Sequence, residues 1–85
     1  MRDAGPFRYR TDVLEQLLQH GVRPTERTPP EVPHEFVSDL YRHELRVLRD
    51  RLLARAFPKP EYYGRVLAIR NRYRVITMKP QEWLE

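Results

Sequence analysis

The sequence predicts a single all-α domain over residues 1–85, a small helical hairpin with a short N-terminal helix and extended termini. Residues 35–57 contain neither glycine nor proline, and their apolar side chains recur at steps of three and four, the period of one helix face. Most of the eight prolines lie in two clusters that helix interiors do not accommodate. The prolines therefore divide the chain into helical segments.

The first helix is expected over residues 12–20. Thr11 is suited to an N-cap, and Gly21 is a preferred residue just beyond a helix end. The apolar residues between them have helical spacing: Leu14, Leu17 and Leu18. Residues 22–33 then contain four prolines, which predicts an extended, proline-rich connector.

The long helix of the hairpin is expected over residues 35–57, with an apolar stripe along one face. Part of this stripe has the heptad spacing of a coiled-coil seam, and these four residues are the candidate interaction face: Tyr41, Leu45, Leu48 and Leu52. The repeat covers barely two heptads, whereas a coiled coil requires three or four. A helical hairpin or a small dimeric bundle therefore fits better.

The second helix of the hairpin is expected over residues 61–73. Pro58 and Pro60 end the long helix and form a tight corner before it. Its inner face has helical spacing: Tyr62, Val66, Ile69 and Tyr73.

Beyond the hairpin, residues 75–85 are expected to form an extended C-terminal tail. The run "RVITMKP" is rich in β-branched residues and lacks a helical period, which indicates an extended segment or a short strand. Trp83 is expected to fold back as an apolar anchor. The alternating stretch "FRYR" at residues 7–10 raises the alternative that the two terminal segments pair.

The charge of the chain is basic but unevenly distributed. The net charge is +4, and fourteen of the sixteen basic residues are arginine, which suits phosphate recognition but also follows from an arginine-favouring genome. Residues 58–79 carry four arginines and two lysines against Glu61 alone. A polyanion surface is therefore expected after Pro58, if one exists.

The stretch "RNRYR" is the strongest nucleic-acid signature in the chain. It places arginines around an aromatic residue, and the candidate nucleic-acid-binding residues are Arg70, Arg72, Tyr73, Arg74 and Lys79. The helix projects Arg70 and Arg74 on one flank and Arg72 on the other, and Tyr73 is also suited to the core. Earlier in the chain, the arginines of the long helix have acids within helical reach, which favours a structural role for them.

Several function classes lack support in the sequence. With no cysteine, the chain has neither a disulfide nor a thiolate ligand, and we expect a cytoplasmic location. No apolar run approaches the roughly 20 residues of a membrane span, and the start of the chain lacks an apolar leader, so no membrane association is expected. The three histidines are scattered, and no phosphate-binding loop exists. We expect no catalytic residues, no metal and no cofactor.

The resulting hypothesis is a small non-enzymatic helical protein-interaction module. Its partner is either another protein or a second copy of the chain in a homodimer. The alternative is a basic RNA- or DNA-binding module that uses the arginine-rich segment 65–79.

Overall fold

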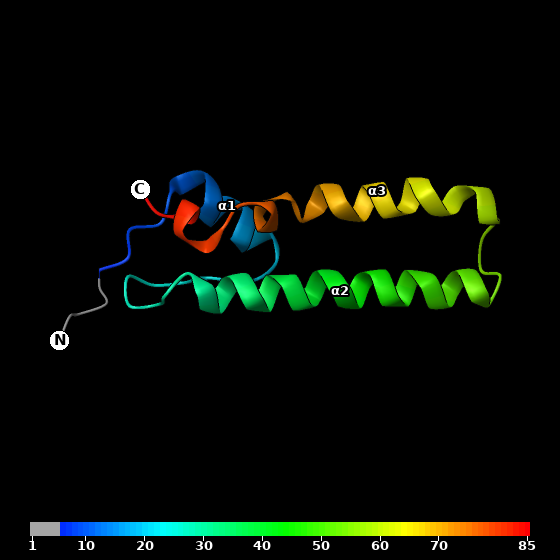
Figure 1. Cartoon of the computed structure of the whole chain (residues 1–85), viewed down its shortest axis with the longest axis horizontal. Helices are drawn as coiled ribbons and strands as arrows, with labels where there is room; N and C mark the ends of the chain where they lie inside the picture. The colour runs from blue at the N-terminus through cyan, green and yellow to red at the C-terminus, as the bar shows by residue number, and fades with distance from the viewer. Residues whose placement is uncertain (1–5) are drawn as a thin grey trace.

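The computed structural model describes residues 6–85, and three α-helices carry most of them (Figure 1). These are α1 (Thr11–Gln19), α2 (Glu31–Leu53) and α3 (Tyr62–Arg72). Three short 3-10 helices complete the described chain: η1 (Lys59–Glu61), η2 (Arg74–Thr77) and η3 (Pro80–Trp83). Residues 6–85 contain no strand beyond an isolated antiparallel bridge between Tyr9 and Leu84. The all-α prediction is confirmed.

The long axis of the molecule is a hairpin of α2 and α3, which run side by side in opposite directions (Figure 1). The molecule measures 54 × 21 × 19 Å. Helix α1, η2 and η3 gather at one end of the hairpin, against the first part of α2. We call this end the head (residues 6–40 and 73–85) and the two-helix remainder the arm (residues 41–72).

Helix α1 ends as its sequence indicates but begins differently. Its N-cap is Arg10, which makes no side-chain cap, so the prediction of an N-cap at Thr11 is wrong. At the other end Gly21 has φ 75°. Its N–H bonds the carbonyl of Leu18, and the next N–H reaches that of Leu17, each at 2.9 Å. This is a Schellman motif, in which the left-handed residue is usually glycine.

Helix α2 begins and ends four residues before the predicted bounds. The connector stops at Pro30, and Pro33 is buried in the first helical turn. The first-turn N–H groups of a helix have no intrahelical acceptor, so a proline costs no hydrogen bond there. The C-terminal end is a second Schellman motif, in which Arg55 takes φ 61° and the Ala56 N–H bonds the Arg51 carbonyl at 2.9 Å.

The C-terminal segment is not extended as predicted, because η2 and η3 occupy most of it. The anchoring role of Trp83 is confirmed: its side chain is fully buried, and its Nε1–H donates to the Val75 carbonyl at 3.0 Å. The two termini do pair over a short length. The Arg10 N–H bonds the Trp83 carbonyl at 2.9 Å, and the Glu85 N–H bonds the Arg8 carbonyl at 2.8 Å.

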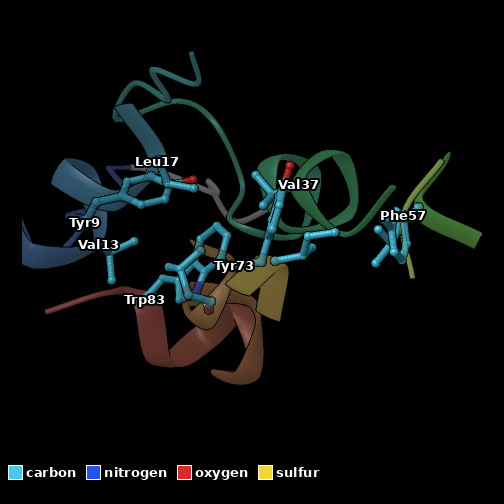
Figure 2. Close-up of a cluster of buried hydrophobic side chains, with 10 residues drawn as sticks. Tyr9, Val13, Leu17, Val37, Phe57, Tyr73 and Trp83 are labelled. Atoms are coloured by element: carbon cyan, nitrogen blue, oxygen red, sulfur yellow. The ribbon is translucent and has the colours of Figure 1, made fainter. Parts of the chain in front are cut away.

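The enclosed part of the core lies in the head. The five largest fully buried side chains among residues 6–85 belong to it: Val13, Leu17, Val37, Val75 and Trp83. Figure 2 shows Val13, Leu17 and Trp83 close to Tyr9 and Tyr73, whereas Phe57 lies apart at the far end of the hairpin. The arm contributes only Leu48, Phe57 and Ile69 to the buried set.

Candidate functional site

A groove of about 480 Å³ runs between α2 and α3 on one side of the arm. Its floor is apolar and consists of Val47 and Leu48 from α2 with Ala68 and Ile69 from α3. Its rim is polar: His43, Glu44 and Arg51 from α2, with Arg65 and Arg72 from α3. The volume lies within the range of natural ligand-binding clefts.

The same spacing in both helices builds this groove. Helix α2 supplies residues 44, 47, 48 and 51, and α3 supplies residues 65, 68, 69 and 72. Steps of three, four and seven place the residues of each set on one helix face. In an antiparallel pair the two faces meet: Leu48 and Ile69 lie innermost, the charged positions lie about 40–60° from them, and Val47 and Ala68 lie about 100° away. We call this side of the arm the groove face.

Ion pairs hold much of the rim in place. Arg72 bonds the Glu44 carboxylate across the two helices at 2.5 Å, and Arg65 bonds Glu61 at 3.0 Å. The Arg65 guanidinium also lies 4.3 Å from the centre of the Phe57 ring. Arg51 forms no ion pair within residues 6–85 and is exposed. The rim therefore offers one uncommitted guanidinium beside an apolar floor.

A polar junction links the groove face to the head. The Tyr73 hydroxyl donates to Glu44, and the His20 ring stacks on the Tyr73 ring with centroids 4.3 Å apart. His20 Nε2 lies 2.9 Å from the carbonyl oxygen of Arg72. Because a carbonyl only accepts, this nitrogen carries the hydrogen. The Tyr41 ring also packs against the Tyr73 ring, with centroids 5.4 Å apart.

The junction shifts the pKa values of two groups. Burial alone would raise the pKa of Glu44, but the hydrogen bonds from Tyr73 and Arg72 and the charges of Arg72 and His20 outweigh it and lower that pKa. Burial, together with the hydrogen bond to Glu44 and its charge, raises the pKa of Tyr73 to about 12. The carboxylate is thus ionised and the phenol neutral at ordinary pH. The Glu44–Tyr73 pair therefore links α2 to the residue that follows α3.

The structure separates the predicted nucleic-acid-binding residues. Arg72 and Tyr73 are both engaged with Glu44, and Tyr73 is buried. Three others are exposed and form no ion pair within residues 6–85: Arg70, Arg74 and Lys79. The five residues therefore do not form one surface.

The predicted interaction face is turned toward the inside of the hairpin. Leu48 is buried, and the other three residues pack against the same core: Tyr41, Leu45 and Leu52. Only Leu48 reaches the groove. Val47, Arg51 and Arg65 were not predicted as site residues. The signal was the equal spacing of the groove residues in the two helices, at 44, 47, 48 and 51 and at 65, 68, 69 and 72.

Hollows also lie elsewhere on the molecule, and one of about 780 Å³ at the turn of the hairpin is lined by residues 52–53 and 55–59. The head exposes two pairs of apolar residues at helical spacing, Leu14 with Leu18 and Val32 with Phe36, and the second pair borders a hollow of about 320 Å³. No three acidic or histidine side chains of residues 6–85 are grouped so that they could hold a metal ion. None of the helices in this part of the chain is both long and apolar enough to cross a membrane.

A scan against protein-family models, a search of curated proteins and a search of solved structures each returned no match to this chain.

Proposed function

We propose that this protein is a non-enzymatic helical protein-interaction module of the cytoplasm, and that a helical segment of a partner protein docks in the groove of the arm. One observation carries the proposal: an apolar floor runs along the groove, and no third helix of residues 6–85 covers it. Helical bundles generally bury such a floor beneath another helix. A partner helix would supply that missing layer.

The charge of the rim favours an acidic partner. Three arginines and a histidine surround the floor against Glu44, and Glu61 pairs with one of the arginines. Arg51 has no acidic partner within the described chain, so a carboxylate of the docked helix would form an ion pair with it. The partner segment is therefore expected to place apolar residues in the groove and an acid beside Arg51.

Photo-crosslinking in the producing cell tests this proposal. A photoreactive amino acid at Ala68, an exposed residue of the groove, is compared with the same amino acid at Asn71, an exposed residue of α3 outside the groove. We expect one protein to crosslink from Ala68 and not from Asn71, with or without nuclease. Equal crosslinking from both positions, or only crosslinks that nuclease removes, would contradict the proposal.

The identified partner then permits a direct measurement. Ala68→Glu places a bulky like charge in front of an acidic helix, so it should weaken the purified complex by about tenfold or more. Asn71→Glu adds the same charge outside the groove and should change the affinity by less than about twofold. A similar loss in both variants would show that the groove is not the docking site.

A second copy of the chain is the alternative partner. The exposed pairs Leu14 with Leu18 and Val32 with Phe36 favour it, because isologous pairing of one apolar patch is the commonest route to a dimer. Sedimentation equilibrium that gives a dimer for the natural chain and a monomer for Phe36→Ser would support this alternative. A monomer mass at high concentration would exclude it.

A further inference from the structure

The side of the arm opposite the groove carries a different kind of surface. Four of its basic residues are exposed and form no ion pair within residues 6–85, whereas Arg42 on the same side pairs with Asp39 and Glu35. Three of the four come from α2 and α3, and Arg74 is the first residue of η2, just beyond the arm; we call these four the arginine face: Arg46, Arg49, Arg70 and Arg74. On the groove face Arg65 and Arg72 are paired and Arg51 is not, whereas none of the four residues of the arginine face is paired within residues 6–85.

Helix geometry places these arginines on one side. With Leu48 and Ile69 taken as the inner line of each helix, the groove residues at 44, 51, 65 and 72 lie about 40–60° away in one direction. Arg49 and Arg70 each lie about 100° away in the other direction, and Arg46 lies about 160° away. In an antiparallel pair, residues that lie at the same angle and in the same direction from the inner line of each helix face the same side of the pair. The lining of the groove shows this, because all four of its charged positions share one face.

The arginines also lie level with one another along the arm. Arg72 on α3 bonds Glu44 on α2, so Arg70, two residues earlier, is level with Arg46, two residues later. Arg49 is one turn further along α2. Packed helices have axes about 8–10 Å apart, so three guanidinium groups share a short stretch of surface.

Few acidic side chains offset the positive charge of this stretch. Asp39 and Glu35 pair with Arg42, at 2.7 and 3.4 Å, near the head. Asp50 lies one turn from Arg46 and about 40° from it around α2, so it offsets part of the charge of Arg46 but not that of Arg49 or Arg70. Over the arm, residues 41–72, there are nine basic against three acidic side chains, a net charge of +6 in a chain whose total is +4. The positive field is therefore concentrated on the arm.

An exposed aromatic side chain lies on the same side. Tyr63 is 69% exposed, and helix geometry places it about 120° from the inner line, two turns before Arg70. Unlike Tyr73, which is buried against His20 and Tyr41, its ring is open to a planar ligand. Phosphate-binding arginines with an open aromatic ring are the two components of a single-strand binding surface.

We propose that the arginine face binds single-stranded nucleic acid without sequence specificity, with phosphates on Arg46, Arg49 and Arg70 and a base stacked on Tyr63. This site is separate from the protein-docking groove, so each can fail without the other. Backbone contacts of this type release counterions and weaken steeply with salt, by a slope of about 0.7 per phosphate on a single strand.

Fluorescence anisotropy with a labelled 20-nucleotide oligo-U, measured across a salt series, tests the proposal. The triple variant Arg46→Gln, Arg49→Gln, Arg70→Gln should lose at least about tenfold in affinity near 100 mM salt and lower the salt slope by about two. The matched control is Arg8→Gln, Arg23→Gln, Arg27→Gln, which removes the same charge from exposed positions of the head. It should change the affinity by less than about threefold.

Tyr63 provides the second readout. Tyr63→Ala should weaken oligo-U binding several-fold, whereas Tyr63→Phe keeps the ring and should restore it. Each of four outcomes would overturn the proposal: no salt-dependent binding by the natural chain, equal losses in the two triple variants, a duplex of the same length bound more tightly, or polyglutamate competing as well as oligo-U. The last outcome would assign the arginine face to an acidic protein. Circular dichroism melts of all variants separate binding losses from unfolding.

Discussion

In the head, five side chains are fully enclosed, whereas the arm buries only Leu48, Phe57 and Ile69, and none of them completely. The two regions share α2 and draw on the same residue types. They differ in the number of layers: in the head η2 and η3 pack against α2 and α1 packs against η2, whereas α3 alone packs against α2 in the arm (Figure 1). Two helices enclose few side chains from all directions, so depth of burial follows from the third layer.

This difference separates stability from binding. A compact chain of 85 residues has a radius of gyration of about 12 Å, whereas this chain has 15.8 Å. The excess comes from the arm, which extends from the head and keeps both of its sides accessible. We infer that the head supplies most of the free energy of folding and that the arm presents the binding surfaces.

The largest expected effect tests the head directly. Trp83→Ala removes the largest fully buried side chain and leaves the Val75 carbonyl without its donor, so it should destabilise the protein by about 3–5 kcal/mol. Urea denaturation followed by circular dichroism measures the change. If this variant does not fold, Trp83→Phe provides a smaller loss for the same comparison.

The matching substitution in the arm should cost less. Leu48→Ala removes a buried side chain from the floor of an open groove, where neighbours can relax, so we expect a loss of about 2 kcal/mol, at the low end of the range for such changes. Leu53→Ala, at a 70% exposed position, serves as the control and should change stability by less than about 0.5 kcal/mol. A loss for Leu48→Ala that exceeds that for Trp83→Ala would reverse the comparison of head and arm.

The hairpin could be predicted from the sequence because it rests on helical periodicity and proline positions. Residues 35–57 and 61–73 were expected as helices, and α2 and α3 occupy Glu31–Leu53 and Tyr62–Arg72. The inner face of α3 was also expected, and its four residues are buried or pack against the core: Tyr62, Val66, Ile69 and Tyr73.

The ends of α2 could not be read in the same way. A cluster of prolines argues against a helix, yet Pro30 and Pro33 occupy the cap and the first turn, where missing N–H groups cost nothing. At the other end, residues 54–56 are good helix formers, and the helix stops because Arg55 adopts a left-handed conformation. Tertiary packing sets that end, since Phe57 is buried immediately beyond it.

The candidate site was only partly accessible to sequence reasoning. Charge counts located the basic segment, but the pairing of Arg72 with Glu44 joins residues 28 positions apart. The burial of Tyr73 likewise depends on His20, the C-cap of α1, and on Tyr41 of α2. Local spacing carries no information about such partners, so paired and unpaired arginines could not be told apart.

The two Schellman motifs offer a smaller test, one in each region. Gly21 in the head and Arg55 in the arm both have positive φ, at 75° and 61°. Gly21→Ala should cost about 1 kcal/mol through backbone strain alone, because an added Cβ meets nothing within 4 Å. Arg55→Gly should stabilise the protein by about 0.5–1 kcal/mol, since relief of strain exceeds the added freedom of the unfolded chain. Thermal melts that shift in the same direction for both variants would contradict this interpretation.

The smallest expected effect concerns the junction of head and arm. The lowered pKa of Glu44 means that the folded state favours its carboxylate, so this group stabilises the protein above its ordinary pKa of 4.5 and loses that contribution as the pH falls through the lowered value. The natural chain should therefore lose more stability below about pH 4.5 than Glu44→Gln, which has no such proton to bind. The difference should be modest, because the Glu44–Arg72 pair is partly exposed.

Glu35→Gln, at an exposed acid 3.4 Å from Arg42, is the control and should follow the natural chain. Urea midpoints measured from pH 7 to pH 3 give the comparison, and parallel curves for the natural chain and Glu44→Gln would show that the carboxylate does not hold the head and the arm together.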